Sequence, residues 1–312
     1  MNKKFLALIL CVSLSVGSSA LAAVTIDSTT FPDSNFRNFI ATTKFDKDGD
    51  RHLSDEEIAS ITELDLTLAS TAMETLKGIE YLTALTELDC YRKGITGTLD
   101  LSQNLALESV RCYDNSITTL ILGNNDVLKT LYCGNNRLRE LDIENNKALK
   151  NLFVNNNCLA TLDFPDLDDL DSFQNFNGKG QTITLSPETL TEEDDGYKFD
   201  LREQLSFDVD GVELQVTLIE ELKAFESGGN EISVDQVANI LSFDKEPSYF
   251  TYKYNVGLRD NESMDVTVRF SNSNNNPTVT PTASDSGGGG CDSGVGFMGL
   301  MLVPAITFRK RK

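Results

Sequence analysis

The feature that most constrains the fold of this sequence is a repeat with a period of 21 or 22 residues. Four segments share one template of apolar and polar positions, and they start 22, 21 and 21 residues apart: LTELDCYRKGI from Leu85, LESVRCYDNSI from Leu107, LKTLYCGNNRL from Leu128 and LKNLFVNNNCL from Leu149. Shorter apolar segments lie between them, namely LDLSQN at Leu99, LILGNN at Leu120 and LDIENN at Leu141. A unit this short cannot bury its own apolar edge, so neighbouring units must stack around one continuous core. The sequence therefore predicts an elongated array of coils.

This template resembles the leucine-rich repeat pattern L-x-x-L-x-L-x-x-N-x-L. The segment ITELDL from Ile61 looks like a first coil and LDSFQN from Leu170 looks like a last one, so we assign the repeats to residues 61–180. The resemblance implies a leucine-rich repeat solenoid with short parallel strands.

The third apolar position of the template carries a cysteine in three of the four repeats. These cysteines are Cys90, Cys112 and Cys133, and the fourth repeat has Val154 in the same position. Because valine is small and apolar, we expect the cysteines to pack in the core as free thiols. Disulfides and a metal site are the alternatives, although no C-x-x-C pair is present. Cys158 lies outside this column, and we expect it to be an exposed thiol.

A second column of the repeats consists of asparagines, namely Asn115, Asn136 and Asn157. A tight turn leaves backbone N–H and C=O groups without partners, and a side-chain amide can supply both a donor and an acceptor. We therefore expect these amides to hydrogen-bond the turns of neighbouring coils.

Polar and aromatic residues alternate with the buried positions on the strand side of the repeats, where they should face solvent. The residues that we expect to contact a partner there are Tyr91, Arg111, Tyr113, Tyr132 and Phe153. Tyrosine and arginine are enriched where binding energy concentrates in interfaces, which favours a partner-binding face. The alternative is that exposed strand positions simply favour aromatic residues.

The twelve residues DKDGDRHLSDEE, from Asp46 to Glu57, resemble the calcium loop of an EF-hand. The ligands that this resemblance implies for Ca²⁺ are Asp46, Asp48, Asp50, His52 through its carbonyl, Ser54 through a water, and Glu57. Position 6 of the loop requires a positive φ and usually has glycine, but here it has Arg51. The loop also occurs once, whereas EF-hands and dockerins come in pairs. The alternative interpretation is an acidic surface turn.

Residues 24–60 surround this loop with two predicted helices. Apolar side chains for covering the first coil are present, namely Phe31, Phe36, Phe39 and Phe45. Because a solenoid needs its end covered, we expect an EF-hand-like helix-loop-helix cap at the N-terminal end. In this interpretation Ca²⁺ has a structural role.

Both ends of the chain have the pattern of targeting segments. Residues 1–23 combine Lys3 and Lys4, an apolar run and small residues, as a secretory signal peptide does. A linker over 272–286 precedes a tail, 287–312, that resembles the C-terminal sorting signals of the Synergistes group, in which a glycine-rich stretch ends in cysteine. The resemblance implies processing near Gly289, Gly290 and Cys291, contact with the membrane and display at the cell surface or outer envelope. A permanent membrane anchor is the alternative.

Residues 181–271 show alternating apolar and polar residues in seven short runs, which predicts a C-terminal β-sandwich. The chain has a net charge of −21, which makes nucleic acid an unsuitable partner. It contains one histidine, His52, so no Ser–His–Asp or Cys–His arrangement is available outside the acidic loop, and we expect no enzyme.

The order of these segments is similar to that of bacterial cell-surface leucine-rich repeat proteins. We therefore expect a secreted, surface-displayed protein that binds a protein or glycan through its solenoid face, as an adhesin does. The alternative is a structural component of the cell envelope that associates with copies of itself.

Overall fold

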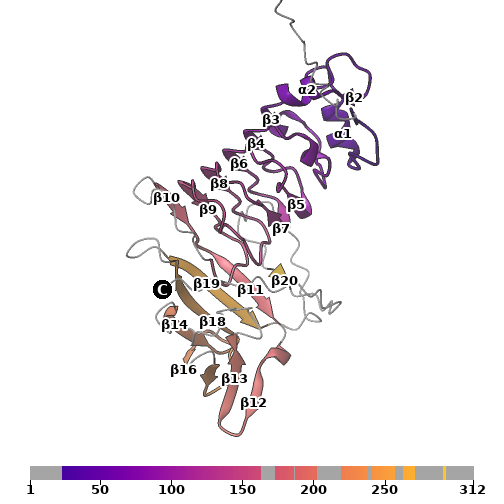
Figure 1. Cartoon of the computed structure of the whole chain (residues 1–312). Helices are drawn as coiled ribbons and strands as arrows, with labels where there is room; N and C mark the ends of the chain where they lie inside the picture. The colour runs from indigo at the N-terminus through magenta and orange to yellow at the C-terminus, as the bar shows by residue number, and fades with distance from the viewer. Residues whose placement is uncertain are drawn as a thin grey trace, which may run out of the picture.

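The computed structural model describes residues 23–162, 173–185, 187–201, 219–237, 240–256 and 263–270, together with the backbone of 291–292. The predicted signal peptide (apart from residue 23), the linker, Gly289 and Gly290 lie outside these residues. Figure 1 shows an elongated molecule in which a stack of coils has two helices at one end and β-sheets at the other. Among the described residues, no helix has the length and apolarity needed to cross a membrane.

The solenoid is built on a parallel sheet with one short strand per coil, as the repeats predicted. Its strands, in spatial order, are β10 (Asn175–Asn177), β9 (Asn151–Phe153), β8 (Thr130–Tyr132), β6 (Ser109–Arg111), β4 (Glu87–Asp89) and β3 (Glu63–Asp65). The central residues of neighbouring strands are in register, for example Leu88 with Val110. In this sheet β3, β4, β6, β8 and β9 each bury the central residue and leave its two neighbours partly or fully exposed, which is the period-two pattern of a half-buried strand.

The opposite side of the coils carries a second set of short elements (Figure 1). Strands β5 (Thr96–Asp100) and β7 (Ser116–Ile121) pair in parallel there. Two 3₁₀ turns lie earlier in the chain: η1 (Leu66–Leu68) directly follows β3, and η2 (Ile79–Tyr81) precedes β4. The buried amides of Asn104, Asn125 and Asn146 donate to backbone carbonyls of the preceding coil. The leucines of the shorter apolar segments, Leu99, Leu120 and Leu141, are buried on this side.

The cysteine column packs in the core, which confirms the expectation of buried free thiols. Cys90, Cys112 and Cys133 are buried free thiols. Desolvation by burial raises the pKa of the Cys112 thiol to about 12, so this sulfur stays protonated and unreactive.

The expectation for Cys158 was wrong. This residue is 2% exposed and disulfide-bonded. Its counterparts in the two preceding coils, Ser116 and Arg137, are partly or fully exposed. Cys158 belongs to the last full coil, and the chain that follows covers it: the Thr182 N–H donates to the Asn157 carbonyl over 2.9 Å.

The asparagine column connects the coils in the way that the sequence predicted. The Asn136 side chain accepts from the Ile117 N–H over 3.0 Å and donates to the carbonyls of Cys112 and Cys133, each over 3.0 Å. Asn115 and Asn157 make the corresponding bonds one coil earlier and one coil later. Gln181 continues the column, since its side chain accepts from Leu159 and donates to Val154 and Gly178.

The N-terminal segment lies over the first coil (Figure 1). Asp33 caps the N-terminal end of helix α1 (Ser34–Ile40), because its carboxylate accepts the N–H groups of Asn35 and Phe36. This helix ends at Ile40, and α2 (Asp55–Ser60) follows the acidic loop, so both predicted helices are present. Phe31, Phe36 and Phe45 are buried in the same core as the coils, and Phe39 packs against it.

Two sheets follow the solenoid. The first has the order β15 (Glu231–Ile232), β14 (Ile219–Phe225), β18 (Tyr249–Asn255), β19 (Ser263–Phe270), β11 (Gln181–Leu185), β20 (Cys291–Asp292), and the second has the order β12 (Thr191–Glu193), β13 (Gly196–Asp200), β17 (Ile240–Phe243), β16 (Val234–Val237). A 3₁₀ turn, η4 (Pro187–Thr189), precedes β12. Aromatic rings meet between the sheets: the ring centroids of Phe199 of β13 and Phe250 of β18 are 5.4 Å apart. One of the seven alternating runs, VELQVTLI at residues 212–219, lies almost entirely outside the described residues.

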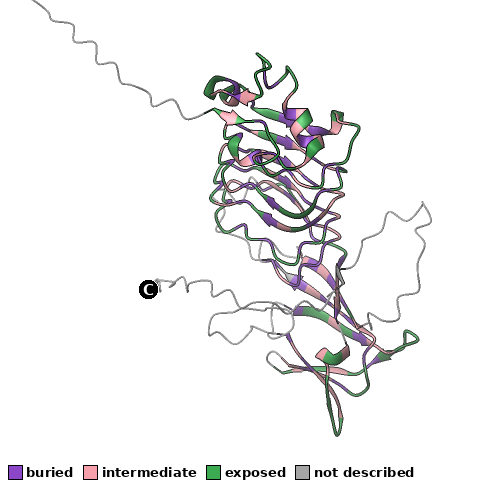
Figure 2. Ribbon diagram, turned by 90° about the vertical axis from the view of Figure 1, so that its right-hand side faces the viewer, coloured by how far each residue is buried: buried purple, intermediate pink, exposed green. Residues whose placement is uncertain are grey.

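The solenoid and the sheets share one core, and buried residues run through the whole described length of the molecule (Figure 2). At the junction, the buried Tyr252 of β18 donates its hydroxyl to the Ala160 carbonyl of the last coil over 3.1 Å. The coils therefore have no bare apolar end in the described structure.

Candidate functional site

The acidic loop brings three of its predicted ligands together. One carboxylate oxygen from each of Asp46, Asp48 and Asp50 lies within 4.8 Å of the others. Asp46 is 1% exposed, whereas Asp48 and Asp50 face solvent. Carboxylate oxygens at this mutual spacing fit the coordination of a hard divalent cation such as Ca²⁺.

The backbone of the loop has the turn that such a site needs. The Asp46 carboxylate accepts the Gly49 N–H over 2.8 Å and the Arg51 N–H over 3.1 Å. Arg51 has a φ of 64°, so the position usually held by glycine is left-handed in spite of its side chain. Its guanidinium donates to the Ile26 carbonyl over 3.3 Å, and this contact helps to hold the turn.

Strand β1 (Val24–Thr25) supports the loop from outside. It pairs in antiparallel orientation with β2 (His52–Leu53), which forms positions 7 and 8 of the loop. The Ile26 N–H extends this pairing by donating to the Arg51 carbonyl over 2.8 Å. A loop that occurs once in the sequence thus obtains a strand partner from the N-terminal segment.

Glu57, the expected ligand at position 12, has other partners in this structure. It forms a capping box with Ser54 at the start of α2, and its carboxylate accepts from the Ser54 N–H over 2.9 Å and from the Lys47 N–H over 2.6 Å. The backbone hydrogen bond from Ser54 is the largest cause of a lowered Glu57 pKa. The Ser54 hydroxyl also bonds Glu57, and the His52 ring contacts the Asp50 carbonyl. The residues therefore fit a calcium loop in part, with three carboxylates gathered and the fourth turned to the helix.

The strand side of the solenoid brings the predicted partner-binding residues into two columns. Strand register aligns Arg111, Tyr132 and Phe153 on adjacent strands. Tyr91 and Tyr113 lie two residues beyond β4 and β6 and form a parallel column. All five side chains are partly exposed, and together we call them the aromatic face.

The rings of the aromatic face are ordered by contacts with one another. Tyr91 and Tyr113 are stacked, with ring centroids 4.6 Å apart and an angle of 6° between the planes. Tyr132 and Phe153 meet edge to face at the same centroid distance. Burial is the main cause of a raised Tyr113 pKa, so this hydroxyl stays protonated and able to donate at neutral pH.

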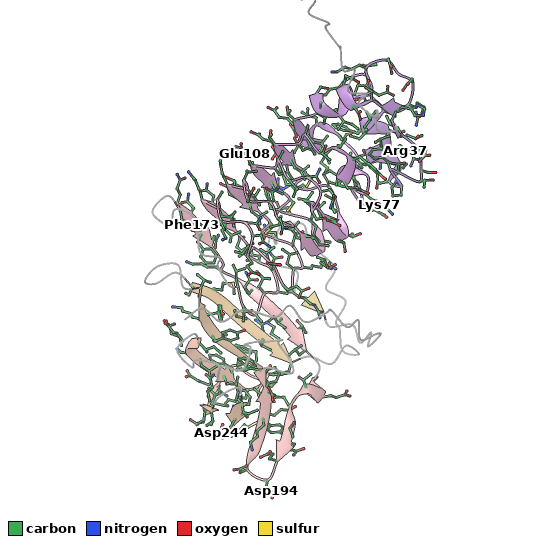
Figure 3. The ribbon with its side chains drawn as sticks, viewed as in Figure 1. Arg37, Lys77, Glu108, Phe173, Asp194 and Asp244 are labelled. Atoms are coloured by element: carbon green, nitrogen blue, oxygen red, sulfur yellow. The ribbon has the colours of Figure 1, made fainter. Side chains whose placement is uncertain are left out.

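Ion pairs between coils border the aromatic face. Arg111 donates to the Asp89 carboxylate over 3.1 Å, and Arg92 donates to Asp114 over 2.8 Å. Further along the same side, Glu108, labelled in Figure 3, pairs with Lys129 over 2.6 Å. These pairs place a carboxylate beside each arginine, but they are at least partly open to solvent and each contributes little to stability.

Sequence reasoning missed parts of this surface. It did not predict that Asp89 and Asp114 hold the arginines, nor that Gln181 continues the asparagine column. The spacing was the available signal, because Asp89 and Arg111 lie one coil apart in the template. One left-handed residue per coil also went unpredicted: Arg92, Asp114, Asn135 and Asn156 all have φ between 54° and 56°.

Of the expected processing residues, Cys291 is described through its backbone. It begins β20, which pairs in parallel with β11. Gly289 and Gly290 lie outside the described residues.

Comparison with known proteins gives one short region of similarity at the sequence level. No protein-family model matches the chain. A stretch of 74 residues, 24% of the chain, is 46% identical to Internalin J of Listeria monocytogenes serotype 4b (strain F2365). The match spans only 8% of the length of that protein.

A solved structure was also matched, described as the functional domain of InlJ from Listeria monocytogenes, which includes a cysteine ladder. The match covers 81% of this chain and 99% of that one at 16% identity, with a TM-score of 0.19. At that score the superposition supports no further conclusion. The leucine-rich repeat solenoid is instead established by the repeats and by their parallel strands.

Proposed function

We propose that this chain is a bacterial surface protein whose leucine-rich repeat solenoid binds a partner through the aromatic face. The observation that carries the proposal is the ordered, partly exposed set of rings along adjacent coils. Rings that already hold one another in place lose little side-chain entropy when a partner covers them. The similarity to Internalin J and the sequence pattern of the two chain ends support a surface location.

The geometry of the rings favours a polypeptide over a glycan as this partner. Sugars stack on an open aromatic face, and the stacking of Tyr91 on Tyr113 at a plane angle of 6° covers one face of each ring. The edges and hydroxyl groups of tyrosine rings suit backbone carbonyls and apolar side chains of a protein. The bordering Asp89–Arg111 pair adds fixed polar groups.

Charge along the strand side points to a partner with basic residues. Glu63 and Glu87 are exposed on β3 and β4, before the first arginine of the sheet at Arg111. The chain as a whole carries a net charge of −21. Complementary charge would increase the rate of association and make it depend on salt.

The acidic loop would hold Ca²⁺ as a structural ion in this proposal. Asp46, Asp48 and Asp50 would supply carboxylate ligands, and Glu57 would have to turn from its capping box to complete the set. The ion would offset the repulsion among the three gathered carboxylates and brace the segment that covers the first coil. The paired sheets beyond the last coil would act as a β-sandwich stalk, and no catalytic step is assigned to any residue.

The experiment uses the purified full chain, immobilised and exposed to arrays of extracellular-matrix proteins and of glycans, with the double variant Tyr113→Ala plus Tyr132→Ala beside it. We expect saturable binding to a protein that the double variant loses by at least tenfold. Tyr81→Ala is the matched control, because Tyr81 is an exposed tyrosine in η2, outside the aromatic face. Binding that survives the double variant, or that requires a glycan alone, contradicts the proposed polypeptide site.

Sedimentation of the same samples tests the alternative of a self-associating envelope component. A monomer over the whole concentration range agrees with the adhesin-like function. Concentration-dependent assembly without any heterologous binding would replace it.

A further inference from the structure

The cysteine at the end of the last full coil differs chemically from the cysteines of the core. Cys90, Cys112 and Cys133 are free thiols, whereas Cys158 is disulfide-bonded. The whole sequence contains six cysteines. With those three free, the partner of Cys158 is either Cys11 or Cys291.

Backbone pairing brings Cys291 close to the coil that carries Cys158. Strand β20 pairs with β11 so that Cys291 lies opposite Ile183. The preceding residue of β11, Thr182, donates its N–H to the carbonyl of Asn157, the residue before Cys158. Thr182 therefore contacts the residue before Cys158, and the next residue of β11, Ile183, pairs with Cys291. Figure 1 shows β20 beside β11, next to the last coils.

The surroundings of Cys158 also require a docked segment. Cys158 as a whole residue is only 2% exposed, so a freely diffusing thiol has little access to it. Strand β11 pairs with β19 on one side, so without β20 its other side would present unpaired N–H and C=O groups at positions 183 and 184. Docking of β20 satisfies those groups and places Cys291 at the coil in the same step.

We propose that Cys158 is cross-linked to Cys291 and that this bond fastens the C-terminal segment to the open edge of β11. The occupant of that edge is thus a named part of the same chain. The inference is independent of the aromatic face and of the acidic loop.

The chemistry of the cross-link balances with an oxidised dithiol protein as the oxidant. Two S–H bonds break and one S–S bond forms between the two sulfurs. The two electrons and two protons reduce the disulfide of the oxidant to a pair of thiols, through a mixed disulfide with one of the cysteines. Oxidants of this class act outside the cytoplasm, where the predicted signal peptide would direct the chain.

The cross-link has a consequence for the expected processing near Cys291. A sulfur held in a disulfide is neither a nucleophile nor a thiol that can be modified. The oxidised protein would therefore keep β20 paired with β11, and reduction would release Cys291 for the expected processing. The Cys158–Cys291 bond would act as a redox-controlled clasp.

Peptide mapping of the full chain tests the clasp. The protein is purified from an oxidising compartment, unfolded in denaturant with an alkylating reagent and no reductant, digested and analysed by mass spectrometry. We expect one linked peptide pair containing Cys158 and Cys291, and alkylated peptides for the three core cysteines. Alkylated Cys158, with or without the tail present, overturns the proposal, as does a link from Cys158 to Cys11.

Hydrogen exchange provides a second readout that does not depend on recovering the tail peptide. In the Cys291→Ser variant and in the reduced wild type, we expect amide exchange in β11 to be at least tenfold faster than in the oxidised protein. The matched control is Cys112→Val, which follows the natural Val154 of the same column and should leave β11 unchanged. Equal exchange in oxidised and reduced wild type would show that no clasp holds β20.

Discussion

At the scale of single residues, this protein is held together by side chains that repeat once per coil. Each asparagine of the column from Asn115 to Asn157 bridges two coils, because its amide satisfies a backbone N–H and two carbonyls at once. The cysteine column fills space of constant size beside it. Both columns could be predicted from the sequence, since identical environments recur at a fixed spacing.

The first prediction concerns Asn136, the middle member of the column. Asn136→Ala removes one accepted and two donated hydrogen bonds and leaves the buried Ile117 N–H without this partner, while the Cys112 and Cys133 carbonyls keep their bonds from Asn115 and Asn157. We expect the free energy of unfolding to fall by about 3 kcal/mol. Urea denaturation measures this, with Asn145→Ala as control because Asn145 is exposed. A loss below about 1 kcal/mol would mean that the column adds little to stability.

A second prediction at this scale uses the pKa of Glu57. Hydrogen bonds from Ser54 and Lys47 lower the pKa of its carboxyl in the folded state below the ordinary value of 4.5. Stability from this group is therefore present above 4.5 and is lost as pH falls through the folded pKa. In the presence of a chelator, we expect Glu57→Gln to destabilise the protein near neutral pH by about 1 kcal/mol, and by less in acid.

Urea midpoints of the wild type and Glu57→Gln at neutral and acidic pH measure this difference. Glu56→Gln is the matched control, because Glu56 is exposed on the same helix. A difference between wild type and Glu57→Gln that is constant with pH would show that the capping box does not depend on the charge.

At the scale of elements, the conformation of the acidic loop depends partly on its local sequence and partly on its tertiary contacts. The spacing of Asp46, Asp48 and Asp50 could be recognised in the sequence, and the structure brings their oxygens within 4.8 Å. The strand partner β1 could not be recognised, because two residues carry no periodic pattern. The orientation of Glu57 depends on competition between the loop and the start of α2, which sequence alone does not resolve.

The prediction for this element is calcium-dependent stabilisation. Lone extracellular loops bind with dissociation constants of about 10⁻⁴ to 10⁻³ M. At about ten to a hundred times that constant, we expect Ca²⁺ to add roughly 1.4–2.7 kcal/mol to the free energy of unfolding. Calorimetry with Ca²⁺ and with chelator measures the shift in melting temperature.

Asp48→Ala should abolish this shift, because it removes one of the three gathered carboxylates. Asp126→Ala is the matched control, since Asp126 is an exposed aspartate outside the loop. If the melting temperature of the wild type is the same with Ca²⁺ and with chelator, the segment is an acidic turn.

At the scale of the whole molecule, stability depends on covering both ends of the coil stack. The N-terminal phenylalanines cover the first coil, and the paired sheets continue the same core from the last one. Because each coil contacts only its neighbours, the junctions at the ends determine where opening begins.

The prediction at this scale concerns the junction at Tyr252. Tyr252→Phe keeps the ring but removes the bond to the Ala160 carbonyl, which leaves that acceptor without this partner. We expect a loss of about 1–3 kcal/mol, and faster amide exchange in the last coil than in the first. Tyr249→Phe on the same strand is the control, because Tyr249 is partly exposed and stacks on Phe225. Uniform acceleration of exchange along the solenoid would contradict a local junction.

The sequence by itself determined the parallel coils, their buried columns and the acidic loop, because each of these depends on residues at short, regular spacing. The same regularity placed the five residues of the aromatic face on the strand side. Tertiary structure alone decided the stacking of Tyr91 on Tyr113, the burial of Cys158 and the pairing of β20 with β11. These features join coils or segments that are distant in the chain, and no local pattern encodes which surfaces meet.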